Sequence, residues 1–222
     1  MESFSARRWP SILAALTKHP RRCLLTIIVA PFSLMVLGAS GAAAQDGSPV
    51  AGLDVPSAAE CTVAPRAADE LRTLFREVAA TPVPTSAEAS PTPAVPPTGA
   101  PADPQTVAEI SATWRQYLAC LNAGDQTRMF ALFSDDMVRR QFVVDLAFGV
   151  TEDALFAYLA ATPVPLLPDQ FVPFVPFADV RVLSDGRVAV VGPGEQGRGD
   201  VRIFVKEGGR WLVDEWFDLT KP

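Results

Sequence analysis

The stretch YLACLNAGD, residues 117–125, decides the first part of the fold. Upstream of it and within it, apolar side chains recur at the spacing of one helical face. These positions are Val107, Ile110, Trp114, Tyr117, Leu118 and Leu121. Gly124 suits the C-terminal cap of this helix, and Asp125 is placed to cap the next one. The sequence therefore predicts two helices joined by a tight break, the first opened by a capping box of Thr106 and Glu109.

The pattern downstream changes from helical to alternating. The second helix would turn Met129, Phe130 and Phe133 inward, and a third is expected from Thr151 until Pro163. Residues 180–182 and 188–190 then flank an Asp-Gly pair, which is a strong hairpin signal. Residues 201–205 and 210–219 flank a second glycine turn. The expected fold class is α+β, with three helices packed against an antiparallel sheet.

The chain before this domain divides into three segments. Residues 1–44 carry basic residues, then a short apolar stretch, then small residues ending at Ala44, the order of a cleavable secretory signal. Residues 45–80 form a short segment with one amphipathic helix over 65–80. Residues 81–104 are a linker rich in Pro, Ala and Thr, and residues 105–222 are the folded domain. We expect cleavage before Gln45, by either the general or the twin-arginine route, and an extracytoplasmic protein. If cleavage fails, the leader is the only segment expected to touch a membrane.

Charge and histidine content exclude several kinds of chemistry for the mature chain. Removal of residues 1–44 leaves 14 basic against 24 acidic residues, a net charge of −10, which disfavours nucleic acid as a partner. The single histidine, His19, lies in the leader. The mature chain then has no imidazole for a metal site, a nucleophile pair or a general base. No cofactor and no metal are expected.

Cys61 and Cys120 are the two cysteines that remain after the leader. An exported protein is exposed to oxidising conditions, so a disulfide that closes a loop of about 60 residues is one interpretation. Two separate thiols, one of them a small core residue on a helix, is the other. The sequence leaves both open.

Three short motifs resemble the nuclear transport factor 2-like superfamily, which includes the SnoaL-like and ketosteroid isomerase-like proteins. They are the break Asn122-Ala123-Gly124-Asp125, the run Ala131-Leu132-Phe133-Ser134-Asp135-Asp136 and the closing Gly209-Arg210-Trp211-Leu212-Val213. The resemblance implies a curved sheet folded around the first helix, a cone-shaped interior with a ligand pocket, and often a dimer through the outer sheet face. It also places Tyr117 at the oxyanion-binding position of the isomerase branch. The general-base position of that branch falls on Gln141, which does not take up a proton, and this departure puts isomerase chemistry in doubt.

The candidate site residues are mostly aromatic, and each has a plain structural alternative. Aromatic side chains at helical spacing often only pack a core. The candidates for ligand binding are Trp114, Tyr117, Phe130, Phe133, Phe174 and Trp211, and those for proton transfer are Tyr117, Glu215 and Asp218. By strict alternation, Trp211 and Val213 should face one side of the last strand and Trp216 the other. Asp200 and Arg202 are expected to be ordinary exposed strand charges.

Three functions fit this sequence. The first is an exported, non-catalytic module that binds a small apolar molecule or a protein, with a homodimer through the sheet. The second is an isomerase- or lyase-type enzyme that uses Tyr117 with an Asp or Glu for proton transfer. The third is a structural dimer in an envelope complex. A superfamily resemblance does not choose among them, because one fold hosts many functions.

Overall fold

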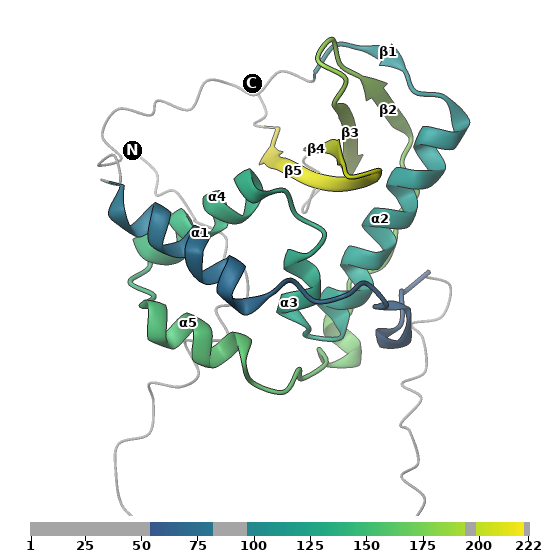
Figure 1. Ribbon diagram of the computed structural model, residues 1–222. Coiled ribbons are helices and arrows are strands. Elements are labelled where there is room, and N and C mark those ends of the chain that lie inside the picture. The colour runs from purple at the N-terminus through teal and green to yellow at the C-terminus, as the bar shows by residue number, and fades with distance from the viewer. Residues whose placement is uncertain (1–53, 82–96, 194–198, 220–222) are drawn as a thin grey trace, which may run out of the picture. The chain divides into compact units, whose positions relative to one another are not determined.

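In a computed structural model, residues 54–81, 97–193 and 199–219 are described, and they form a mixed α+β structure (Figure 1). The five α-helices are α1 (Ala68–Ala80), α2 (Pro104–Asn122), α3 (Gln126–Phe130), α4 (Asp135–Ala147) and α5 (Glu152–Leu159). The five strands are β1 (Ala100–Pro101), β2 (Asp179–Val182), β3 (Val188–Pro193), β4 (Gly199–Glu207) and β5 (Arg210–Asp218). The expected signal segment and residues 82–96 of the expected linker lie outside the described residues.

The long helix α2 begins earlier than the sequence pattern predicted. Its N-cap is Asp103, whose side chain accepts a hydrogen bond from the backbone N–H of Thr106 at 3.0 Å, and Pro104 occupies the first turn. The predicted Thr106–Glu109 capping box is therefore wrong. The predicted break after α2 is confirmed, because Gly124 has φ +67° and a Cβ there would lie 2.1 Å from the Val164 carbonyl oxygen.

The segment after the break forms two helices where the sequence pattern predicted one. Asp125 caps α3 as predicted, but α3 ends at Phe130, and Phe133 then lies alongside β5 in a parallel bridge to Val213. Ser134 caps α4, a helix that the sequence reasoning missed. Thr151 caps α5 as predicted.

The sheet is antiparallel throughout, in the order β1-β2-β3-β4-β5. Both predicted hairpins are confirmed. Gly186 (φ +83°) lies in the turn between β2 and β3, and Gly208 and Gly209 lie between β4 and β5, also with positive φ.

A bulge at Asp214 changes which side chains of β5 share a face. Ile203 pairs with Glu215 while the next residue, Phe204, pairs with Val213, so Asp214 has no partner across the ladder. The extra residue reverses the alternation. Trp216 therefore packs against the same core cluster as Trp211 and Val213, and the strict alternation predicted for this strand is wrong.

The two faces of the sheet bury separate apolar clusters. The larger one joins the sheet to the helices and includes the apolar face of α1, formed by Leu71, Leu74, Phe75 and Val78. The smaller one is built on Ala189, Val201 and Ile203. Helix α1 lies against α4 and α5 (Figure 1), so its apolar face belongs to the helix-side cluster.

Candidate functional site

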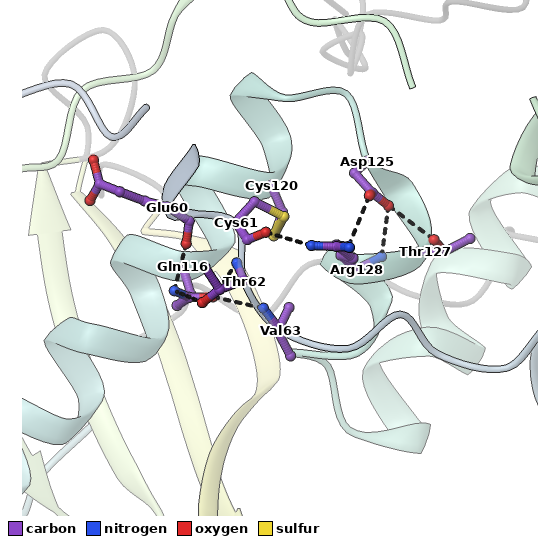
Figure 2. Close-up of a disulfide and its surroundings, with 9 residues drawn as sticks. All are labelled: Glu60, Cys61, Thr62, Val63, Gln116, Cys120, Asp125, Thr127 and Arg128. Carbon is purple, nitrogen blue, oxygen red and sulfur yellow. Dashed lines mark hydrogen bonds and ion pairs between the residues drawn. A yellow bond between two sulfur atoms is a disulfide. The ribbon is translucent and has the colours of Figure 1, made fainter. Parts of the chain in front are cut away.

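A disulfide between Cys61 and Cys120 ties the N-terminal strap, residues 54–81, to the middle of the domain (Figure 2). The Cα atoms of the two cysteines are 4.7 Å apart, and both side chains are buried. Of the two alternatives that the sequence left open, a disulfide and two separate thiols, the structure has the disulfide. Such a bond is typical of oxidising compartments and fits an extracytoplasmic protein.

Polar contacts on either side of the disulfide hold the strap in register with α2. The Gln116 side-chain oxygen accepts hydrogen bonds from the backbone N–H groups of Thr62 and Val63, both at 3.2 Å. Its nitrogen donates to the Glu60 carbonyl oxygen at 2.6 Å, and Arg128 donates to the Cys61 carbonyl oxygen at 2.7 Å (Figure 2). The strap backbone is thus fixed along one face of α2 and at α3.

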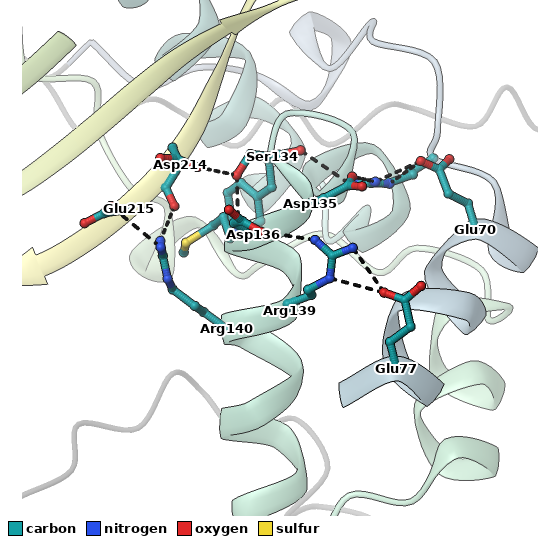
Figure 3. A network of polar contacts seen from close by, with 12 residues as sticks. Glu70, Glu77, Ser134, Asp135, Asp136, Arg139, Arg140, Asp214 and Glu215 are labelled. Atoms are coloured by element: carbon teal, nitrogen blue, oxygen red, sulfur yellow. Dashed lines mark hydrogen bonds and ion pairs between the residues drawn. The ribbon is translucent and has the colours of Figure 1, made fainter. Parts of the chain in front are cut away.

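A second polar network joins the start of α4 to the bulge in β5 (Figure 3). The Ser134 hydroxyl donates to Asp214 Oδ1 at 2.7 Å and accepts from the Met137 backbone N–H. Arg187 binds both Asp214 and Glu215, at 3.0 and 2.7 Å, and Arg140 lies 3.6 Å from Glu215. Glu215, a candidate for proton transfer, is therefore held between two guanidinium groups.

The interior between α2 and the sheet is filled by stacked aromatic rings. Tyr117 stacks on Trp114 at 4.6 Å between ring centroids and on Phe133 at 5.5 Å. Phe130 packs edge-on to Phe133. Trp114, Tyr117, Phe130 and Phe133 are each at most 4% exposed. Burial raises the pKa of the Tyr117 hydroxyl above its ordinary value, with the positive charge of Arg202 opposing the shift.

Asp200 and Arg202 form a buried ion pair beside this stack, which contradicts the expectation that they are exposed strand charges. Arg202 Nη2 lies 2.5 Å from Asp200 Oδ2, and the side chains are 10% and 4% exposed. The Arg202 guanidinium lies over the Trp114 ring at 4.2 Å, and Trp216 Nε1–H donates to Asp200 Oδ2 at 3.1 Å. Burial lowers the pKa of Arg202, with the nearby Asp200 charge opposing the shift.

This interior pair is not fully satisfied. Asp200 Oδ1 and Arg202 Nε are buried and find no hydrogen-bond partner among the described residues. Gly192 on β3 makes room for the pair, because a Cβ at this position would lie 2.9 Å from Asp200 Oδ1 and 3.0 Å from Arg202 Nη1. The interior therefore holds a closed polar pair that has two unused hydrogen-bonding atoms.

Gln141, the residue at the expected general-base position, lies on α4 and donates to Asp145 Oδ1 at 3.2 Å. Burial raises the pKa of Asp145. The acid in this part of the helix is thus one turn away from the position that the resemblance indicated.

A ligand-sized hollow in the described structure lies outside the aromatic interior. It is a groove of about 340 Å³ between α2 and the β4–β5 hairpin, with the strap as one side. Its lining residues are Val63, Glu109, Ala112, Thr113, Gln116, Leu132, Gly209, Arg210, Trp211 and Leu212. Its volume falls within the range of about 300–1,000 Å³ that is typical of small-molecule sites.

Most polar groups of the groove already have partners. Glu109 Oε2 accepts hydrogen bonds from Lys206 Nζ and from Trp211 Nε1, both at 2.9 Å. These bonds, with a third from Gln105, lower the pKa of Glu109 to about 2. Thr113 donates to the Trp211 carbonyl oxygen at 3.3 Å. The Trp211 indole is thus held in place as one wall of the groove.

The predicted ligand-binding residues divide between these two regions. Trp114, Tyr117, Phe130 and Phe133 lie in the filled interior, and Phe174 packs against the same cluster with the Arg115 guanidinium 5.7 Å from its ring centroid. Of these candidates, only Trp211 lines the groove. Asp218 lies at the end of β5 opposite Asp200, and its side chain is outside what the structure describes.

Sequence reasoning missed Arg202 and Arg210 for different reasons. Arg202 alternates with buried apolar residues in β4, and the apolar run Val201-Arg202-Ile203-Phe204 was the available signal that this strand is covered on both faces. Arg210 follows a glycine turn, where basic residues are ordinary, so no sequence signal distinguished it.

No helix within the described ranges is long and apolar enough to cross a membrane. In the same ranges, no group of three or more His, Cys, Asp and Glu side chains is arranged to hold a metal ion. No protein-family model matches the chain, and searches of curated proteins and of solved structures found no match. The site must therefore be interpreted from its own geometry.

Proposed function

We propose that the protein is exported and that residues 105–222 form a non-catalytic module of the nuclear transport factor 2-like class that binds a small apolar ligand. The helix break at Gly124 and the sheet that packs on α2 support the class assignment. The buried Cys61–Cys120 disulfide and the signal-like residues 1–44 support export.

One observation carries the binding function: the interior is closed and the groove beside Trp211 is open. The aromatic stack and the Asp200–Arg202 pair occupy the space between α2 and the sheet. The groove, in contrast, is of ligand size and has apolar walls from Val63, Leu132 and Trp211.

The state of the candidate acids and bases favours binding over catalysis. The Tyr117 hydroxyl is buried and its pKa is raised, which moves it away from proton exchange at neutral pH. Glu215 is engaged by Arg187 and Arg140, and Asp200 by Arg202.

Mass spectrometry of the exported protein under native conditions tests this function. We expect a mature chain that begins at Gln45 and carries a chemically unaltered small molecule. Ala112→Phe places a ring in the groove from an exposed position on α2, so it should remove the bound molecule without unfolding the domain. Recovery of the same molecule from wild type and Ala112→Phe would contradict the groove as the site, and its conversion to a product would support an enzyme instead.

A further inference from the structure

The residues that line the groove favour a ligand whose main part is apolar. The lining is largely apolar: it includes the aliphatic residues Val63, Ala112, Leu132 and Leu212 and the aromatic Trp211. Because Trp211 Nε1–H is bound to Glu109, the indole N–H is not free to bind a ligand. A small apolar or aromatic body fits these walls.

The charged residues around the groove indicate which charge a polar group of the ligand should carry. The Glu109 carboxylate is compensated by Lys206, so this pair adds no net charge. Arg210 also lines the groove and is exposed. Its cross-strand neighbour Glu207 forms no ion pair with it, although the two residues are register partners across the turn.

Arg210 differs in this respect from every other basic residue that the structure describes. Residues 54–81, 97–193 and 199–219 contain twelve Arg and Lys side chains, and all but Arg210 form an ion pair. The mature chain carries an excess of acidic residues, so an uncompensated arginine at a groove is unusual. One free guanidinium matches one carboxylate, because the two groups can form paired, charge-assisted hydrogen bonds.

We infer that the groove takes a small apolar molecule that carries a single carboxylate, and that Arg210 binds this carboxylate. The inference rests on the proposed binding function and adds the chemical class of the ligand. A cationic ligand would meet Glu109 only after displacing Lys206 and Trp211. A neutral ligand would leave Arg210 unused.

Binding of 2-naphthoate, measured by calorimetry and by the indole N–H resonance of Trp211, tests the inference. The uncharged 2-naphthamide has the same rings and serves as the matched ligand. We expect wild-type protein to bind 2-naphthoate about tenfold more tightly than 2-naphthamide, the size of one charge-assisted hydrogen-bonded contact. Arg210→Gln should remove this preference, and Arg210→Lys should restore part of it.

Arg181→Gln is the matched control, since it removes the same charge from β2, away from the groove lining. It should leave both affinities unchanged, whereas a general loss of attraction to anions would lower 2-naphthoate binding in both variants and overturn the inference. Equal binding of the two ligands that Ala112→Phe abolishes would also overturn it, while leaving the groove as the ligand site. Absence of binding by either ligand would contradict both the inference and the groove.

Discussion

Arg202 and Arg210 lie on adjacent strands of one hairpin and meet opposite environments. Arg202 on β4 is buried against Trp114 and paired with Asp200, two residues before it on the same strand. Arg210 at the start of β5 is exposed, lines the groove and forms no ion pair with any described residue. The same side chain is thus a neutralised part of the interior in one place and an available cation in the other.

The two arginines differ in how far their charge is removed from water. A guanidinium leaves water at a considerable cost, which a buried partner offsets only in part. Two unused atoms, Asp200 Oδ1 and Arg202 Nε, indicate that the offset is incomplete in the interior. Arg210 is exposed and forms no ion pair, so it could bind the proposed ligand without first breaking an internal ion pair.

The largest expected effect is on the free energy of unfolding, which should depend on the Asp200–Arg202 pair and hardly at all on Arg210. Asp200→Ala leaves Arg202 buried without its carboxylate and should destabilise the fold by about 3–5 kcal/mol. Asp200→Leu combined with Arg202→Met removes both charges and should cost much less, because no unpaired charge remains. Arg210→Met should leave the free energy of unfolding nearly unchanged. Urea unfolding followed by tryptophan fluorescence measures all three, and an equal loss for Asp200→Ala and Arg210→Met would refute the contrast.

The second effect concerns the strap, which borders the groove and packs against the helix-side cluster. Cys61→Ser with Cys120→Ser opens a loop of 59 residues in sequence separation and should cost about 4 kcal/mol on the chain-entropy view. Since Val63 follows the bridge and lines the groove, 2-naphthoate binding should weaken as well. Unfolding with and without reductant measures the first change, and calorimetry the second.

Thiol labelling of the native wild-type protein provides the control for this prediction. Neither Cys61 nor Cys120 should react before reduction. If the double variant is as stable as the wild type, the apolar face of α1, the ion pairs of the strap and Gln116 hold the strap without the disulfide.

Local signals in the sequence were enough for the helix break and both hairpins. Gly124, Asp125 and Thr151 act through their own backbone or through the next turn, so their effect can be predicted without the rest of the fold. Helix α4 was missed because its buried residues, Met137, Val138 and Phe142, are too few to give a clear helical period.

The interior pair and the groove depend on contacts between distant segments. The bulge at Asp214 is set by how β5 aligns with β4, and it reverses the side on which Trp216 lies. The groove needs the strap, α2 and the β4–β5 hairpin together, which are far apart in sequence. The apolar run around Arg202 in β4 was the one local signal for the interior pair, and no pattern within one element indicated the groove.

The smallest expected effect tests whether Glu109 leaves Arg210 as the one uncompensated charge of the groove. Hydrogen bonds from Lys206, Gln105 and Trp211 lower the pKa of Glu109 from its ordinary value of 4.5 to about 2. A lowered pKa means that the stabilising contribution of these bonds is complete above about pH 4.5 and is lost as the pH falls towards 2. The Trp211 indole N–H resonance should therefore titrate with a midpoint near pH 2, and this titration should be absent in Glu109→Gln. A midpoint near 4.5 would mean that Glu109 is not held by Lys206, and the groove would then carry a second free cation beside Arg210 under mildly acidic conditions.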